Sequence, residues 1–176
     1  MYKRQFLSLG LGIKDQSSSV PQYFLKYPNK LKGRSILKVD VTFPAPVANE
    51  YEAIYFSDLA KTLQCQTIES MFSNKLVALI ERYEKNNSIA GRDIFDINSF
   101  YQKNIKYRRD IIEERRSSSL LIFFKELKIF VQDKITQQTI DEDLNPLLSS
   151  IEFKKIRKFL KQEMLFFIDE QLKELS

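Results

Sequence analysis

The sequence contains no histidine and a single cysteine, Cys65, among its 176 residues. A disulfide framework is therefore excluded, and so is a zinc site of the cysteine and histidine kind. Cys65 has no histidine to activate it, which makes a cysteine nucleophile a poor explanation of any activity. A lone cysteine is typical of a reducing compartment, and we expect a cytoplasmic protein.

Helix breakers are scarce, with four glycines and five prolines, and no apolar run approaches the roughly 18–20 residues of a membrane span. The start, MYKRQFLSLGLGIKDQ, is basic and briefly apolar, but it has no convincing cleavage site of a signal peptide. Hydrophobic residues make up 43% of the chain and charged residues 29%. These proportions predict a globular protein rich in helices, without a membrane partner.

The net charge is mildly positive, at +5. A basic excess of this size is compatible with RNA, DNA, nucleotide phosphates or an acidic protein partner. It is equally compatible with the ordinary surface of a soluble protein. Charge alone therefore selects no function.

The pattern of apolar residues in the sequence changes near Thr67. Residues 1–66 hold short apolar runs between turn signals, and residues 67–176 show the period of helices. We expect strands in the first region and helices in the second. The expected strands are 2–13, 35–43 and 51–56, and the expected helices are 68–84, 92–101, 104–116, 117–135 and 149–172. The fold class is therefore α+β, a small and incomplete sheet followed by a helical bundle.

A lysine interrupts the apolar stripe of the first expected helix. The stripe is formed by Ile68, Met71, Phe72, Leu76, Leu79, Ile80 and Tyr83. Lys75 falls inside it, and on the next helix Asp93 and Asp96 share a face with Ile97. Arg92 could pair with Asp96 four residues later.

Two explanations of these charges stay open. Buried charges are costly unless they are paired or bind a ligand. The first explanation is a salt bridge between the helices, or a lysine that reaches out to water. The second is a polar pocket in which Lys75 meets phosphate and a carboxylate accepts a proton or holds Mg²⁺.

A third acid, Asp40, lies in the expected strand KVDVTF. Alternation places it on one face with Lys38 and Thr42. This face is either exposed to solvent or presents a metal-binding carboxylate.

A basic segment follows the second expected helix. Its cations are Lys103, Lys106, Arg108, Arg109, Arg115 and Arg116, interleaved with Tyr101 and Tyr107. A segment in which cations alternate with aromatic rings can bind RNA. The interspersed Asp110, Glu113 and Glu114 favour a solvated helix with many ion pairs instead.

The strand ILKVDVTF, the helix NKLVALIER and the segment GRDIFDI occur in an order that resembles the AbiEii family of nucleotidyltransferase-like toxins. The family belongs to bacterial type IV toxin–antitoxin and phage abortive-infection systems. The matching positions are Lys38 and Asp40, then Lys75, Leu76, Ala78, Leu79 and Arg82, then Arg92, Asp93, Asp96 and Ile97. The resemblance covers roughly residues 35–101.

The resemblance implies a nucleotidyltransferase that moves a nucleoside monophosphate from an NTP to an acceptor such as tRNA, with Mg²⁺ and a cognate antitoxin as further partners. It implies that Asp40 is directed at the metal, that Lys75, Arg82 and Arg92 bind the NTP, and that Lys75, Asp93 and Asp96 are catalytic.

One family motif is missing from the sequence. A Gly-Ser pair followed by a D-x-D pair of acids should precede the K-x-D strand, and only Asp15 is present there. We therefore expect a truncated or split domain, which is inactive alone, needs another chain, or has become a binding module. The alternative is a non-catalytic helical interaction protein, or an RNA-binding protein, derived from such an enzyme.

Overall fold

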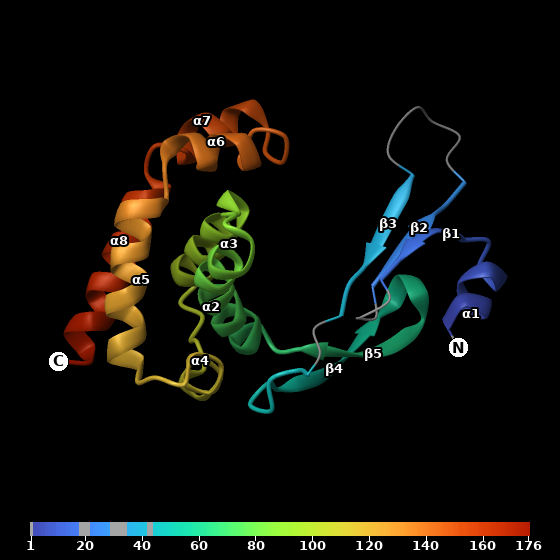
Figure 1. The fold of residues 1–176 in the computed structure, drawn as a ribbon, viewed down its shortest axis with the longest axis horizontal. Helices are drawn as coiled ribbons and strands as arrows, with labels where there is room; N and C mark the ends of the chain where they lie inside the picture. The colour runs from blue at the N-terminus through green and yellow to red at the C-terminus, as the bar shows by residue number, and fades with distance from the viewer. Residues whose placement is uncertain (1, 18–21, 29–34, 42–43) are drawn as a thin grey trace. The chain divides into compact units, whose positions relative to one another are not determined.

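The computed structural model of the protein describes residues 2–17, 22–28, 35–41 and 44–176. Within these residues the chain forms two compact units, Met1–Ala45 and Pro46–Ser176. Small sheets come first in the sequence and helices follow, which confirms the α+β prediction (Figure 1). No described helix has the length and hydropathy that crossing a bilayer requires.

The first unit contains a short helix and a three-stranded antiparallel sheet. The elements are α1 (Tyr2–Ser8), β1 (Gly12–Gln16), β2 (Tyr23–Lys26) and β3 (Ile36–Val39), in the sheet order β1-β2-β3. The strand expected over residues 2–13 is wrong for its first part, because α1 occupies it. Gly10 has φ 73°, a left-handed conformation that suits glycine and separates α1 from β1.

The strand expected over residues 35–43 is confirmed for Ile36–Val39. Thr42 and Phe43 lie outside the described residues. Asp40 comes directly after the strand and is exposed.

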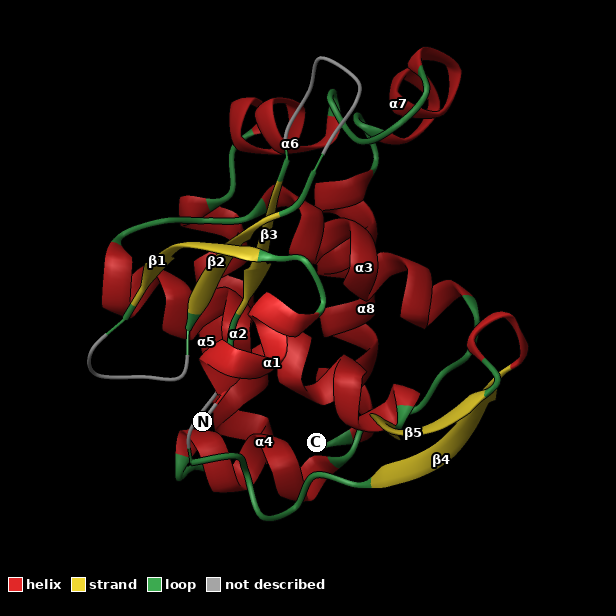
Figure 2. Cartoon of the chain, turned by 90° about the vertical axis from the view of Figure 1, so that its right-hand side faces the viewer, coloured by secondary structure: helices red, strands yellow, loops and turns green. Residues whose placement is uncertain are grey.

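The second unit begins with a hairpin of two antiparallel strands (Figure 2). Strand β4 (Tyr51–Phe56) confirms the third expected strand, and β5 (Lys61–Gln66) was not expected. A single 3-10 turn, η1 (Ser57–Leu59), joins them, and Ala60 adopts a left-handed conformation with φ 48°. Strand β5 escapes detection because KTLQCQ is weakly apolar and mostly exposed on both faces.

Seven helices follow in the described chain (Figure 1). They are α2 (Ile68–Asn86), α3 (Gly91–Gln102), α4 (Arg109–Arg116), α5 (Leu120–Lys134), α6 (Gln137–Leu144), α7 (Ser150–Ile156) and α8 (Leu160–Glu174). The Thr67 side chain caps α2, and the Ser119 side chain caps α5. Side-chain caps at these positions explain why both helices start where they do.

The last expected helix, over residues 149–172, is two helices. Ser149 and Glu152 form a capping box at the start of α7, but α7 ends at Ile156 and α8 begins at Leu160. Apolar residues at helical spacing are nevertheless buried at Phe153, Leu160, Met164 and Phe167, and half-buried at Ile156. The apolar residues therefore keep their helical spacing on both sides of the break between α7 and α8.

The helices enclose one hydrophobic core. Long helices α5 and α8 lie side by side, and α2 and α3 face them (Figure 1). Aromatic rings fill the centre: the Phe72 and Phe167 ring centroids are 5.7 Å apart, and those of Phe124 and Phe167 are 5.9 Å apart. Burial of this apolar surface is the main stabilising contribution to the unit.

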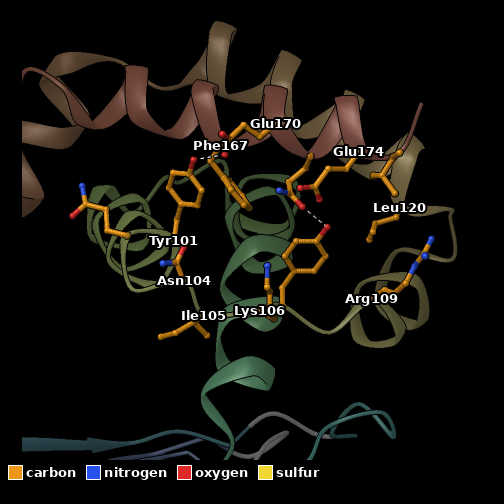
Figure 3. A pocket seen from close by; sticks show the side chains of 13 residues that line it. Tyr101, Asn104, Ile105, Lys106, Arg109, Leu120, Phe167, Glu170 and Glu174 are labelled. Carbon is orange, nitrogen blue, oxygen red and sulfur yellow. Dashed lines mark hydrogen bonds between the residues drawn. The ribbon is translucent and has the colours of Figure 1, made fainter.

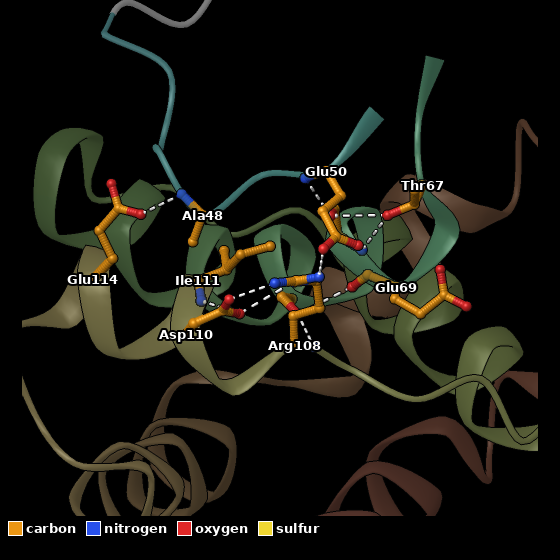
Figure 4. Close-up of polar contacts among 10 residues, drawn as sticks. Ala48, Glu50, Thr67, Glu69, Arg108, Asp110, Ile111 and Glu114 are labelled. Atoms are coloured by element: carbon orange, nitrogen blue, oxygen red, sulfur yellow. Dashed lines mark hydrogen bonds and ion pairs between the residues drawn. The ribbon is translucent and has the colours of Figure 1, made fainter. Parts of the chain in front are cut away.

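Polar contacts tie the chain before the hairpin to α2 and α4 (Figure 4). The Glu114 carboxylate accepts the backbone N–H groups of Val47 and Ala48 at 2.7 and 2.8 Å. The Glu50 N–H donates to the Ser70 hydroxyl at 3.0 Å. These bonds satisfy backbone donors of an irregular segment, so residues 46–50 are fixed against the helices.

Candidate charged site between helices α2 and α3

The lysine in the apolar stripe of α2 meets both acids of α3. Its Nζ lies 2.7 Å from Asp93 Oδ1 and 2.8 Å from Asp96 Oδ2. The neighbouring stripe residues Phe72, Leu76, Leu79 and Ile80 are buried. Ile68 and Met71 are exposed instead of buried, although Ser70 and Phe72 beside them are buried, so both lie at the edge of the buried face of α2. The interruption of the stripe at residue 75 is therefore explained by a charged contact with the next helix.

A second cation of α2 reaches the same acid. The Nη2 atom of Arg82 lies 2.9 Å from Asp93 Oδ2. Lys75 and Arg82 are seven residues apart, two helical turns, so they share a face of α2. Asp93 Oδ1 therefore faces Lys75, and Asp93 Oδ2 faces Arg82. We call Lys75, Arg82, Asp93 and Asp96 the α2–α3 cluster.

Burial within the α2–α3 cluster is unequal. The side chain of Asp93 is 1% exposed, whereas those of Lys75 and Arg82 are 31% and 33% exposed and that of Asp96 is 39% exposed. Asp93 therefore forms the floor, and the other three charges form a rim that reaches water. A buried carboxylate requires such partners, because desolvating an unpaired charge is costly.

The environment keeps Lys75 charged. Burial disfavours the ammonium, but hydrogen bonds to Asp93 and Asp96 outweigh it and raise the pKa of Lys75 above its ordinary value. A lysine of this kind is a fixed cation at neutral pH and does not act as a base.

Arg92 does not join the cluster. It is exposed on α3 next to buried Asp93, and within the described residues it makes no ion pair. The pairing of Arg92 with Asp96 is therefore wrong, because Asp96 faces Lys75. A contact between Arg92 and an NTP stays a prediction.

Asp40 belongs to the first unit and has its own partners. Its carboxylate lies 2.6 Å from Lys38 Nζ and accepts a hydrogen bond of 2.9 Å from Gln22 Nε2. Lys38 and then Gln22 lower the pKa of Asp40. Lys38 and Asp40 therefore share a face, as alternation predicts.

Within its own unit, neither Asp40 nor the pair of Asp93 and Asp96 makes an Mg²⁺ site. Mg²⁺ prefers several oxygen ligands, usually including one or two carboxylates. Across the described ranges, no group of three or more histidine, cysteine or acidic side chains is placed to hold a metal. Asp40, Asp93 and Asp96 each already contact a cation. The metal-directed role of Asp40 remains a prediction.

Four of the six cations of the basic segment are held by acids, and one of these pairs is Arg109 with Glu113. The other pairs are Arg108 with Glu50 and Asp110, Arg115 with Glu81, and Arg116 with Glu84 and Glu126. Figure 4 shows Arg108 between its two acids. This agrees with the helix of many ion pairs that the interspersed acids favour, and it leaves fewer cations for a polyanion.

The tyrosines of that segment line a pocket of about 740 Å³ between the end of α3 and α8 (Figure 3). The Tyr101 hydroxyl donates to Glu170, and the Tyr107 hydroxyl donates to Gln171 Oε1 at 2.7 Å. The contact with Glu170 raises the pKa of Tyr101 to about 12, and burial raises that of Tyr107 to about 12. Both phenols are therefore structural donors at neutral pH.

The charges around this pocket oppose one another. Lys106 and Arg109 lie on the side of the basic segment, and Glu170 and Glu174 lie on α8 (Figure 3). Two cations face two acids, so the pocket has no net preference for an anion.

The geometry defines a helical unit with paired charges between α2 and α3. Small sheets precede this helical region in the sequence. The family model described as "Nucleotidyl transferase AbiEii toxin, Type IV TA system" matches residues 5–174. The chain therefore belongs to the AbiEii family of nucleotidyl transferase toxins of type IV toxin–antitoxin systems. This confirms the resemblance that the K-x-D, K-L-x-A-L and R-D-x-x-D segments carry.

Among solved structures, the chain is similar to JHP933 from Helicobacter pylori, with 19% sequence identity and a TM-score of 0.44. That similarity covers 94% of this chain and 67% of the other. Comparison with curated proteins gives no match.

Proposed function

We propose that this chain serves nucleotidyl transfer in a bacterial toxin–antitoxin or phage-defence system, with the α2–α3 cluster meeting the triphosphate of an NTP. The supporting observation is that buried Asp93 holds two cations whose outer parts reach water. Cations fixed before the ligand arrives lose little entropy on binding phosphate. Family membership supplies the class of reaction.

Asp96 is the exchangeable partner in this proposal. Lys75 contacts two carboxylates, and the one that is 39% exposed yields to a phosphate more readily than the one that is 1% exposed. Phosphate binding then frees Asp96, which is positioned to orient an acceptor hydroxyl or take its proton. Asp93 stays below and holds Lys75 and Arg82 in place, so we assign it a positioning role.

The remaining partners are part of the same proposal. The acceptor is an RNA such as tRNA, and a type IV toxin implies a cognate antitoxin. Because the acids described here do not form a magnesium site, we assign no step to Mg²⁺.

Calorimetric titration of each NTP, with and without Mg²⁺, tests the proposal. We expect Lys75→Met to weaken NTP binding at least tenfold without unfolding the chain. Asp96→Asn removes the carboxylate that competes with phosphate, so it should bind NTP as tightly as the natural chain or more tightly. Lys125→Met, at an exposed lysine of α5 outside the cluster, is the control of equal charge and should change nothing.

The second candidate is a non-catalytic interaction protein, in which the cluster only joins α2 to α3. The equal numbers of cations and acids in the cluster favour this candidate, since every charge already has a partner. It requires that the chain bind no NTP, or that Lys75→Met leave the NTP affinity unchanged.

A further inference from the structure

A second pocket lies between α3 and α7, on another face of α3. Its volume is about 320 Å³. Its lining includes Phe95, Asn98, Ser99, Leu148, Lys155 and Ile156. Phe95 and Asn98 are three residues apart and share a helical face, whereas Asp93 and Asp96 point toward α2. The pocket is therefore separate from the α2–α3 cluster.

Among the polar side chains that line this pocket, Asn98 is a buried amide without a complete set of partners. Asn98 is 4% exposed, and its Oδ1 atom has no hydrogen-bond partner in the described chain. Asn74 on α2 shows the usual arrangement. Its Nδ2 donates to Asn49 Oδ1 at 2.7 Å and to Ser70 O at 2.9 Å, and its Oδ1 accepts from Arg115 at 2.7 Å. A buried acceptor left unpaired lowers stability, so Asn98 is costly unless a ligand supplies a donor.

The surroundings of Asn98 limit the chemistry of that ligand. The half-buried Phe95 side chain lines the pocket beside apolar Leu148 and Ile156. A carboxamide offers a donor and an acceptor in one plane, which is how asparagine pairs with the edge of a nucleobase. Aromatic side chains stack on bases of any sequence. A volume of about 320 Å³ is at the small end of ligand pockets, which suits one base and its sugar.

The rim of the pocket carries one acid and one cation. Glu152 lines it, but its carboxylate accepts the Ser149 hydroxyl at 2.6 Å and the Ser149 N–H at 3.2 Å in the capping box. Lys155 is exposed, and in the ranges that the structure describes it forms no ion pair. Lys155 is therefore the cation that a phosphate at the mouth of this pocket would contact.

We propose that the pocket between α3 and α7 binds the base of a ribonucleotide, with Asn98 pairing with the edge of the base and Lys155 contacting its phosphate. A free mononucleotide and single-stranded RNA offer the same chemistry. This site uses no residue of the α2–α3 cluster, so its test is independent of the test of the proposed NTP contact.

The test uses the full chain, the four ribonucleoside monophosphates, and a fluorescein-labelled 12-nucleotide single-stranded RNA. We expect binding of at least one probe, which Asn98→Leu weakens at least tenfold. Because leucine removes the unpaired acceptor, Asn98→Leu should also raise the Tm of the chain without ligand. Ser118→Ala is the matched control: Ser118 Oγ is also buried without a partner but does not line the pocket, so its removal should leave the affinity unchanged.

The phosphate contact has its own pair of variants, neither of which touches the core. Lys155→Ala should weaken the binding of a monophosphate at least threefold and leave the unphosphorylated nucleoside unaffected. Lys154→Ala, on the same helix but outside the pocket, should change neither affinity. Competition of labelled RNA by the monophosphate identifies the source of the ligand: displacement shows that both occupy this pocket.

Two results would overturn the proposal. One is that neither the monophosphates nor the RNA bind. The other is that Asn98→Leu and Lys155→Ala bind the probes as tightly as their controls, which would leave Asn98 as a purely structural amide. A Lys75→Met variant that keeps its affinity for monophosphate, while losing affinity for NTP, would separate the two sites directly.

Discussion

Asp93 should couple Lys75 to Arg82 energetically, because both cations neutralise one buried carboxylate. The perturbation is Lys75→Met, Arg82→Met and the double variant, which remove the charges and keep most of the apolar stems. Each cation is about one-third exposed, and Asp93 keeps the other cation in either single variant. We therefore expect each single variant to lower the free energy of unfolding by about 1 kcal/mol.

The double variant leaves Asp93 buried without a cation from α2. Removing the partners of a buried charge costs about 3–5 kcal/mol. The loss should therefore exceed the sum of the single variants by about 1–3 kcal/mol, which is the range of coupling between residues in one network. Asp96 does not compensate, since it carries the same charge as Asp93.

Urea unfolding followed by circular dichroism measures these free energies from the midpoint, provided that the m-value is unchanged. The matched control is Lys125→Met with Lys154→Met, two exposed lysines without ion pairs in the described chain. Their effects should add and stay within about 0.5 kcal/mol each. If the Lys75 and Arg82 losses also add to within about 0.5 kcal/mol, the two cations do not share a buried anion and the cluster is misassigned.

Three further predictions concern other parts of the second unit. Gly91→Ala should lower the Tm by several degrees in a thermal melt, because its Cβ would lie 2.7 Å from the Thr139 carbonyl oxygen and 3.0 Å from the Ile140 Cα; an unchanged Tm would show that α6 moves away freely. Tyr101 and Tyr107 have raised pKa values of about 12. The stability that these two phenols contribute is therefore complete below about pH 10 and is lost as the pH rises through about 12. Tyr101→Phe should reduce this loss of stability when unfolding is measured at alkaline pH. Glu114→Gln removes one charged acceptor from the N–H groups of the segment before the hairpin, and amide exchange there should accelerate about tenfold, whereas equal exchange would mean that other contacts fix the segment.

Much of the second unit is determined by sequence alone. The period of apolar residues, together with Thr67, Ser119 and Ser149 as caps, is enough to locate its main helices, because these signals act within one or two turns. The charge of Lys75 inside an apolar stripe is a local signal of the same kind. It shows that a partner is needed, and Asp93 and Asp96 share the face that supplies it.

Only the tertiary structure decides how those charges are used. In the folded chain Asp93 contacts both Lys75 and Arg82, and Asp96 is the more exposed partner of Lys75. Arg92 lies outside the cluster. The tertiary structure also buries Asn98 with an unpaired oxygen in a pocket that α7 completes, from a residue that no motif distinguishes. Burial and pairing depend on side chains that are distant in sequence and meet only after the helices pack, and for this reason local patterns cannot specify them.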